Sequence, residues 1–428
     1  MITQLRLIDF KGFADTTLKL GPFSVIVGTN ASGKSNIRDA FRFLHGIGRG
    51  YTLAEIIGGK FGFGGQAEWA PLRGAANEIA RFGSEKFQIE VEFRLDSYTY
   101  AYSICIAIDQ SLRSGLRVQH EQLKRIPFWQ LDPIFTTHPM YGDPVSRQDD
   151  ESHLLVRMAK AGEQRKYGER LAVRPEQPAL TQVYEFKRVS KTYKDYVAGI
   201  ISDLAEMRFL DLVPEAMRRP SFPGQSVLGD SGENLPTVLF DICADTSTKA
   251  VLLDWIRELT PMDVSDLDFP RDDVSGLVQL VLVEGNGNRV SAYSASDGTL
   301  RFLAMLAALL SSNRSGLYFF EEIDNGIHPA RMRLLIDLIE RQTGKGDIQV
   351  VTTTHSPDLL TMIGDSTFET TSVVGRLPRT DSSIIREIRD FPHIAELRTN
   401  QGLGRLHASG WLEDALVFTA PDEGEAAP

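Results

Sequence analysis

The sequence predicts an α/β fold, a mixed sheet flanked by helices with antiparallel strands in one part and an inserted helical subdomain. The apolar segment "FSVIV" (23–27) passes through a glycine-rich turn into an amphipathic helical stretch. Two further apolar segments, 317–320 and 348–354, are separated by helical sequence, the order of a β-α-β unit with parallel strands. The segments "KFQIEVEFRL" and "YTYAYSICIAID" alternate in polarity, which is typical of antiparallel strands.

Composition is that of an ordinary globular chain. Of 428 residues, 42% are hydrophobic and 24% are charged, enough for one large domain or two to three smaller ones. The two cysteines show no CxxC spacing, which favours a reducing compartment. The beginning of the chain lacks the features of a secretion signal, and the longest apolar run (302–310) is far shorter than the roughly 20 residues of a membrane span. We therefore expect a cytoplasmic protein that has no membrane partner.

The charge balance argues against a general nucleic-acid coat protein. There are 46 basic and 57 acidic residues, a net charge of −11, and no run of five or more Lys or Arg. A local patch could still contact phosphates, but composition gives DNA binding no support.

The strongest motif lies between residues 28 and 36, "GTNASGKSN". Gly28, Gly33, Lys34 and Ser35 match G-x-x-x-x-G-K-[ST], and the match sits between an apolar strand and a helix, where such a loop belongs. Loop N–H groups and the helix N-terminus would hold phosphates, Lys34 would reach the β- and γ-phosphates, and Ser35 would hold Mg²⁺. The predicted nucleotide-binding residues here are Gly28, Asn30, Ser32, Gly33, Lys34, Ser35 and Asn36. The alternative is a chance glycine-rich turn.

Two adjacent carboxylates, Glu321 and Glu322, follow the apolar run 317–320. A P-loop nucleotide requires an acid at the end of a second strand near Mg²⁺, and Glu321 suits that role, with Glu322 placed to act as general base on the attacking water. Burying unpaired carboxylates is costly, so a metal and a reacting water give a reason to keep them there. The alternative is a helix cap or an exposed ion pair.

His355 ends the next apolar segment, one helix after the acidic strand. The carboxyl edge of a parallel sheet is where ligands bind, so His355 is a candidate for hydrogen bonding to the γ-phosphate, although a lone histidine is more often structural. Ser296, Asp297 and Gly298 precede a strongly apolar helix and predict an N-cap with an open, positive N-terminus.

Together, "GTNASGKSN", "SDGTLRFL", "FFEEIDNGIHP" and "TTTHSP" resemble the ABC-type ATPases of the SMC, RecF and OLD-like group. In particular, the chain looks like the small prokaryotic ATPases of that group that carry an AAA label, several of which serve in phage defence or genome maintenance. The resemblance covers residues 1–47 and 290–362, and the middle matches only loosely. Glu321 stands where many members have Asp, and Ile323 where Pro is common; both changes keep the acid.

The resemblance implies a P-loop NTPase fold of ABC type and a mechanism. ATP and Mg²⁺ at the P-loop of one protomer would face Ser296 and Gly298 of a second protomer, so that a head-to-tail homodimer encloses two ATP molecules until hydrolysis releases it. A larger assembly is compatible with this arrangement. A glutamine that links the metal to the β-lobe is also expected, and Gln66 and Gln88 are both candidates.

On this basis we divide the chain into four parts. Residues 1–130 would form the N-terminal part of the ATPase head, with P-loop and β-lobe, and 131–285 an inserted, mainly helical or irregular subdomain. Residues 286–415 would complete the head, and 416–428 would be a disordered acidic tail. The stretch 183–210 reads as helical, but sustained heptads are missing, so no long coiled-coil arm is expected.

Three functions fit these observations. The first is an ATP-hydrolysing switch that controls a separate effector, such as a nuclease, in prokaryotic anti-phage defence; the compact chain, without an arm or a basic stretch, favours it. A nuclease within this chain is not expected, because few residues follow His355. The second is a RecF-like DNA-binding repair ATPase. The third, an ATP-binding scaffold without turnover, is disfavoured because Lys34, Glu321, Glu322 and His355 are all present.

Overall fold

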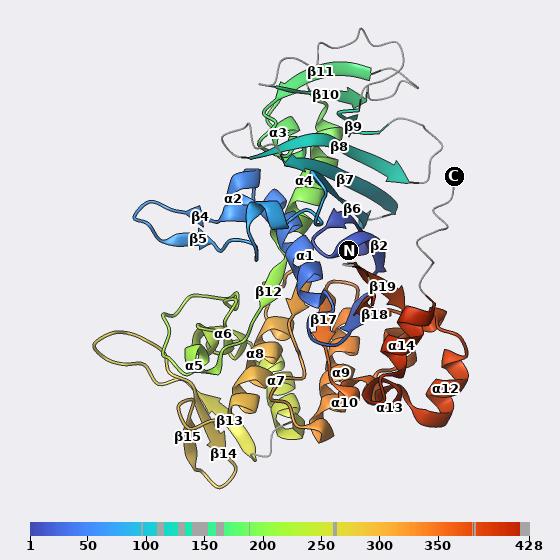
Figure 1. Cartoon of the computed structure of the whole chain (residues 1–428). Helices are drawn as coiled ribbons and strands as arrows, with labels where there is room; N and C mark the ends of the chain where they lie inside the picture. Colours follow the sequence, from blue (N-terminus) through green and yellow to red (C-terminus); the bar gives the residue numbers. More distant parts are fainter. Residues whose placement is uncertain are drawn as a thin grey trace.

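A single mixed sheet runs through the molecule (Figure 1). The computed structural model describes residues 1–95, 97–108, 115–126, 133–138, 153–159, 167–187, 189–259, 263–378, 380 and 382–419. The sheet has 14 strands in the order β11-β10-β9-β8-β7-β6-β1-β2-β19-β18-β3-β17-β16-β12, with separate sheets β13-β14-β15 and β4-β5. Its antiparallel part forms a lobe and its parallel part a core with helices on both faces, which confirms the predicted fold class.

The parallel core consists of buried strands. In order of position they are β18 (Thr371–Arg376), β3 (Phe23–Val27), β17 (Gln349–Thr354), β16 (Leu317–Phe320) and β12 (Arg208–Leu210). Every residue of β3, β16 and β17 is buried, as expected of parallel strands covered on both faces. β3 and β16 are largely apolar, whereas β17 also buries Gln349 and three threonines. Thr354 pairs with Val27 and Thr352 with Phe320, so these strands end at one edge of the sheet.

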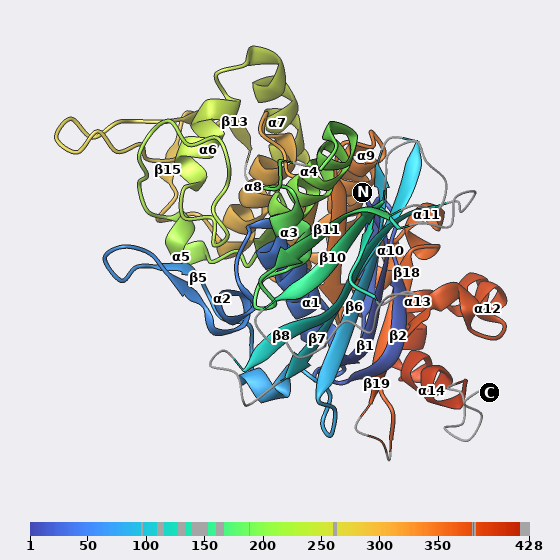
Figure 2. The same cartoon turned by 90° about the horizontal axis from the view of Figure 1, so that it is seen from above.

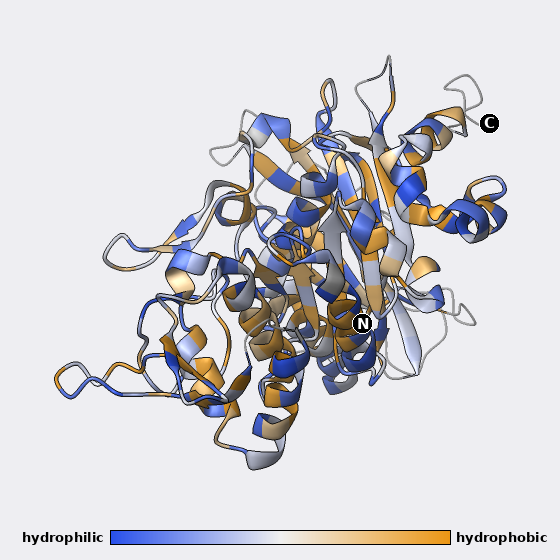
Figure 3. Cartoon of the chain, turned by 90° about the horizontal axis from the view of Figure 1, so that it is seen from below, coloured by the Kyte–Doolittle hydropathy of each residue, from blue (hydrophilic) through white to orange (hydrophobic). Residues whose placement is uncertain are grey.

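Helices cover both faces of this core (Figures 1 and 2). One face carries α1 (Lys34–Gly48) and α4 (Lys191–Ala205), and the other α8 (Asp297–Leu310) and α9 (Pro329–Thr343). In β3, Val25 belongs to the second face's apolar core and Ile26 to the first, as strand alternation dictates. Figure 3 shows apolar residues concentrated in these central strands and helices.

The antiparallel lobe extends further along the chain than predicted. Its main strands are β1 (Ile2–Phe10), β2 (Phe13–Lys19), β6 (Lys86–Leu95), β7 (Tyr98–Ile108) and β8 (Leu116–Ile126). The short strands β9 (Phe135–Thr136), β10 (Leu154–Ala159) and β11 (Tyr167–Val173) continue the same sheet. The predicted boundary at residue 130 therefore falls inside the lobe, because such short strands carry little periodic signal. β19 (Ser383–Glu387) joins the lobe to the core.

The inserted subdomain is helical but also holds a small sheet. It contains α3 (Ala179–Val183), α5 (Pro214–Met217), α6 (Leu235–Ile242), α7 (Thr246–Leu259), β13 (Val264–Asp268), β14 (Val281–Glu284) and β15 (Arg289–Ser291). The predicted boundary at 285 separates β14 from β15, which pair with each other. The stretch 183–210, read as helical, ends instead in strand β12, whose pairing with β16 overrides local propensity.

The C-terminal part packs against the core through α10 (Pro357–Met362), α11 (Asp365–Phe368), α12 (Ile394–Gln401), α13 (Leu403–Ala408) and α14 (Trp411–Phe418). The tail predicted from residue 416 overlaps α14, because Leu412 and Leu416 are buried one helical turn apart. Residues 420–428 lie outside the described residues. The remaining elements are α2 (Leu53–Gly58), β4 (Lys60–Phe61), β5 (Ala67–Trp69) and two 3₁₀ turns, Ala76–Glu78 and Ile388–Asp390. Within the described ranges, no helix is long and apolar enough to cross a membrane.

A buried carboxylate joins the lobe to the inserted segment. Glu121, on β8, accepts hydrogen bonds from Ala179 N (2.6 Å), Leu180 N (2.7 Å) and the Tyr102 hydroxyl (2.9 Å). Burial raises the pKa of Glu121 to about 7, in opposition to these hydrogen bonds, which favour the ionised form. The native state therefore binds this proton more tightly than the unfolded chain does.

This pKa predicts a pH dependence of stability. Below pH 4.5 both states are protonated; between pH 4.5 and 7 the unfolded chain ionises first, so the free energy of unfolding should fall by about 3 kcal/mol and then level off. In urea unfolding at pH 5, 6 and 7, Glu121→Gln should remove this decrease of the unfolding free energy with pH. The substitution can also shift the unfolding free energy by the same amount at every pH. The exposed Glu85→Gln is the matched control, and an unchanged slope in Glu121→Gln would contradict the assignment.

Candidate active site

The loop between β3 and α1 has the backbone of a phosphate cradle. Ala31 (φ 62°) and Gly33 (φ 115°) adopt left-handed conformations that turn the chain tightly into the helix. At Gly28 the backbone approaches the carbonyl oxygen of Val374 so closely that a Cβ would clash with it. The Nζ of Lys34, which is only 9% exposed, donates to the carbonyl oxygens of Gly28 and, at 2.9 Å, Thr29. The loop therefore curls around the lysine.

The polar groups of this loop fit an anion. The first turn of α1 has no side-chain cap and no acidic residue, so its N–H groups and its positive dipole end face the loop. Ser32 Oγ is buried and has no hydrogen-bond partner among the described residues. Asn30 and Ser35 are exposed and Asn36 is half-buried, all on the same loop or first turn. These donors are those that a polyphosphate would use.

The ammonium of Lys34 lies in the field of several carboxylates. Burial lowers the pKa of Lys34, and the nearby charges of Glu322, Asp324 and Glu413 act in the opposite direction. The structure thus brings Lys34 and Glu322, which are 288 positions apart by their numbers, into one electrostatic environment.

The close approach of Gly28 to the carbonyl oxygen of Val374 predicts that adding one methyl group at residue 28 destabilises the fold. Gly28→Ala should displace the loop from β18 and destabilise the fold by about 1–3 kcal/mol, with weaker nucleotide binding as a result. The measurement is urea unfolding together with ATP titration. Gly58→Ala is the control, because a Cβ there meets no atom within 4 Å, and it should change stability by less than about 0.5 kcal/mol. Equal effects of the two variants would refute the close-packing argument.

Glu322 and His355 meet at the carboxyl edge of the parallel strands. Glu322 follows β16 with a left-handed backbone (φ 47°), a strained conformation for a non-glycine residue, and its N–H donates to Thr353 Oγ1 at 3.2 Å. Its Oε1 lies 3.3 Å from Nδ1 of His355, which follows β17. Both side chains are about half exposed, so they can reach a ligand at this edge. The neighbouring strands bring these two predicted residues together.

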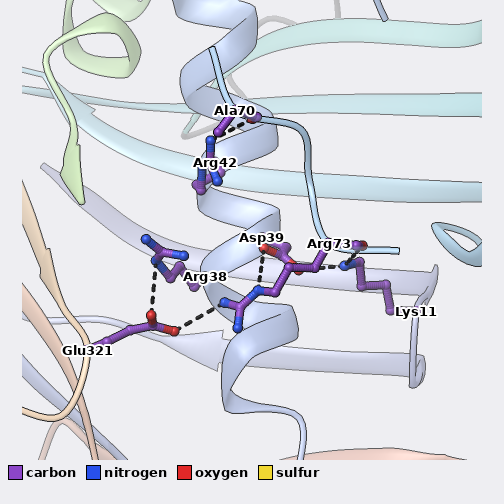
Figure 4. Close-up of polar contacts among 7 residues, drawn as sticks. All are labelled: Lys11, Arg38, Asp39, Arg42, Ala70, Arg73 and Glu321. Atoms are coloured by element: carbon purple, nitrogen blue, oxygen red, sulfur yellow. Dashed lines mark hydrogen bonds and ion pairs between the residues drawn. The ribbon is translucent and has the colours of Figure 1, made fainter. Parts of the chain in front are cut away.

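Glu321 belongs to an arginine network that sequence reasoning missed (Figure 4). Its Oε1 lies 3.1 Å from Nη2 of Arg73 and its Oε2 3.6 Å from Nε of Arg38. Arg73 also pairs with Asp39 (3.5 Å), whose other oxygen is 2.5 Å from Nζ of Lys11. Arg38 stands one helical turn after Lys34, a spacing that could have revealed it, whereas Arg73 lies in a loop without any motif.

The element Ser296-Asp297-Gly298 begins α8 as predicted. Ser296 Oγ accepts from Thr299 N (3.2 Å), and Asp297 pairs with Arg218 at 2.5 Å. A Cβ at Gly298 would clash with the carbonyl oxygen of Gly326, so the backbones of these two segments are in contact.

A cavity of about 380 Å³ opens at this helix start. It is lined by Ser296, Asp297, Gly298, Thr299, Phe302, Gly326, Ile327, His328 and Arg331. None of the P-loop residues 28–36 is among them, so the structure does not bring this element against the P-loop of its own chain.

Further polar residues surround the edge without any sequence signal. Asp324 accepts from Thr354 Oγ1 (2.8 Å). From α13 and α14, His407 contacts the carbonyl oxygen of His355 (3.2 Å) and pairs with Glu413 (3.1 Å). Helices at the end of the chain therefore support the histidine that follows β17.

Neither candidate glutamine is singled out by its contacts. Gln66 is exposed between β4 and β5, and Gln88 on β6 donates to Glu90 Oε1 at 2.7 Å. The choice between them stays open.

Fold and site together define a P-loop NTPase of ABC type. The sequence profile of the family described as "AAA domain, putative AbiEii toxin, Type IV TA system" matches residues 23–231 and 244–361. The chain belongs to this AAA family.

Individual relatives are distant. An "ATP/GTP phosphatase" of Helicobacter pylori (strain ATCC 700392 / 26695) is 20% identical over 375 residues, 85% of this chain and 87% of the relative. Among solved structures, an SMC head bound to the C-winged helix domain of ScpA is 13% identical with a TM-score of 0.48, covering 90% of this chain and 96% of that one. The SMC head domain from Thermotoga maritima is 11% identical with a TM-score of 0.43, covering 90% and 98%.

Proposed function

We propose that this protein binds ATP at the P-loop and hydrolyses it. The observation that carries the proposal is the placement of the Glu322–His355 pair at the sheet edge that the P-loop also occupies, close enough for Glu322 to act on the Lys34 ammonium. Lys34 would hold the β- and γ-phosphate oxygens, and the loop N–H groups would hold the rest of the polyphosphate. The name of the Helicobacter relative, a nucleotide phosphatase, supports this activity.

The residues at the site fit Mg²⁺ as a cofactor. In the described part of the chain, no group of three or more His, Cys, Asp or Glu could hold a metal alone. Mg²⁺ usually takes one or two protein oxygens and completes its shell with phosphate oxygens and water. Ser35 and Glu321 would supply the protein ligands. When bound, the ion would neutralise charge that develops on the transferred phosphoryl group.

Glu322 and His355 would perform the remaining chemistry. The carboxylate of Glu322 lies 3.3 Å from Nδ1 of His355, and there it could accept a proton from water attacking the γ-phosphate. His355 would donate a hydrogen bond to the γ-phosphate, with its backbone held by His407.

We further propose that ATP closes a head-to-tail homodimer. The Ser296–Gly298 helix start borders a cavity and lies apart from the P-loop of its own chain, so a second protomer's nucleotide is a suitable occupant. Closure and release of this dimer would switch a separate effector, such as a nuclease, in anti-phage defence. A cytoplasmic location follows from this role.

Phosphate release from ATP tests the proposal. Purified protein should release phosphate from ATP in the presence of Mg²⁺, and the release should stop when EDTA is added. Sedimentation should show a dimer that forms only with ATP. No release under any of these conditions would contradict the proposed activity. Strong stimulation of turnover by duplex DNA, lost steeply with salt, would instead favour a DNA-repair role.

A further inference from the structure

A second polar cavity, of about 420 Å³, lies beside α1. Residues of α1, of β12 and its flanks, of β5 and of the segment at 230–231 surround it. Its lining is Arg38, Arg42, His45, Arg49, Tyr51, Glu68, Trp69, Ala70, Met207, Arg208, Phe209, Asp211, Val213, Asp230 and Ser231. None of the P-loop residues 28–36 is included, and, among the described residues, the cavity adjoins the nucleotide site only through Arg38, which pairs with Glu321.

Four arginines and three carboxylates line this cavity, a formal excess of one positive charge. Arg38, Arg42 and Arg49 occur at spacings of four and seven residues, which places them on one face of α1, and Arg208 joins them from β12. Burial lowers the pKa of His45 to about 4, so its ring is neutral and adds no charge. Such a concentration of guanidinium groups in a concave site is costly unless anions neutralise it.

Within the described residues, two of these four arginines form salt bridges. Arg208 pairs with Asp230 (3.3 Å) and Arg38 with Glu321 (3.6 Å). Arg42 instead donates a hydrogen bond to the carbonyl oxygen of Ala70 at 2.8 Å (Figure 4). Its guanidinium also lies 4.8 Å from the centre of the Trp69 ring.

The other two arginines form no direct ion pair with any described residue. In the part of the chain that the structure describes, neither Arg42 nor Arg49 has a salt bridge, and the buried Nε of Arg208 has no hydrogen-bond acceptor. Burial, and secondarily the charge of Arg38, lowers the pKa of Arg42, while the more distant carboxylates of Asp39 and Asp230 act in the opposite direction. An anion in the cavity would relieve both effects.

We propose that this cavity binds a phosphorylated small molecule through Arg42, Arg49 and Arg208. The planar guanidinium fork matches phosphate oxygens in pairs, and several arginines together select a multiply charged anion. The volume lies within the range of small-ligand pockets. Glu68 and Asp211 also line it, and their oxygens would accept hydrogen bonds from hydroxyl groups of the ligand.

The enclosed shape distinguishes this ligand from a nucleic acid. Arg42 and Arg208 are partly buried in a concave site, which a small anion can enter and a rigid duplex backbone cannot. The net charge of −11 points in the same direction. Duplex DNA is therefore the competing outcome of the test.

Calorimetry with pyrophosphate, in full-length protein carrying Lys34→Ala, tests the proposal. The background substitution weakens the P-loop, so the heat that remains reports on the second cavity. We expect one saturable site, and we expect Arg42→Gln to weaken it at least tenfold. Arg49→Gln, at the exposed rim, should weaken it several-fold without risk to the fold, and Arg94→Gln on β6 is the control.

The outcomes separate this proposal from the proposed ATPase. Saturable binding that Arg42→Gln and Arg49→Gln weaken, with unchanged melting temperatures, supports the cavity even if the wild-type protein hydrolyses no ATP. Loss of all pyrophosphate binding in Lys34→Ala alone overturns it, as does binding that neither arginine variant alters. Binding of duplex DNA through these arginines, with no pyrophosphate binding, also overturns it.

Discussion

Lys34→Ala is expected to reduce ATP turnover by roughly 10²–10³-fold, the size of effect found when one positioned charge is removed from a reacting oxyanion. The ammonium is buried within the loop and held by the carbonyls of Gly28 and Thr29, so it is already placed where phosphates would bind. Alanine removes both the charge and the group around which the loop folds. ATP affinity should therefore fall along with turnover, as equilibrium titration and phosphate release would show.

The control for this variant is Lys86→Ala, an exposed lysine on β6 that should leave both quantities unchanged. A melting curve separates loss of binding from loss of the fold. If Lys34→Ala bound ATP as tightly as the wild type, the P-loop interpretation would be wrong, and the activity would have to be sought elsewhere in the chain.

Much of the parallel core could be predicted because its sequence signals are local. The segments 23–27 and 317–320 are short, largely apolar runs, and 349–354 is rich in β-branched residues. Each is followed by polar residues with recognisable roles, and the structure buries every residue of the three segments. The short strands β9–β11 and β12 lacked such a signal. Their conformation comes from pairing with strands distant in sequence, as β12 does with β16.

The residues of the candidate site also fall into a group with local sequence signals and a group without them. Residues of the loop and of the strand ends could be named because each lies within a short motif. Arg73, His407 and Glu413 could not, since only folding brings their loop and helices to Glu321 and His355. Their roles depend on proximity in the folded chain, and no short motif in the sequence indicates that proximity.

Glu322→Gln is expected to bind ATP normally but to hydrolyse it roughly 10²–10⁴-fold more slowly. Glutamine has nearly the same shape, and the hydrogen bond from residue 322 to Thr353 uses the backbone, so the local fold should persist. The amide can still accept a hydrogen bond from His355, but it cannot take a proton from water. Single-turnover phosphate release and ATP titration measure the two quantities separately.

Glu321→Gln provides the matched comparison. This substitution would remove a metal-ligand charge and the partner of Arg38 and Arg73, so it should raise the Mg²⁺ concentration needed for activity. Glu322→Gln should leave that Mg²⁺ requirement unchanged. Identical behaviour of the two variants would show that the carboxylates do not divide metal binding and proton transfer between them.

Because Glu322→Gln should stall after ATP binding, it should also accumulate the closed dimer together with whatever that dimer controls. Mass spectrometry of proteins that co-purify with the tagged variant, in ATP and Mg²⁺, would then identify the partner. A stoichiometric effector protein such as a nuclease would support the switch. Duplex DNA without a protein partner would support repair, and a monomer with bound ATP would contradict head-to-tail closure, since the Ser296–Gly298 helix start would have no nucleotide to contact.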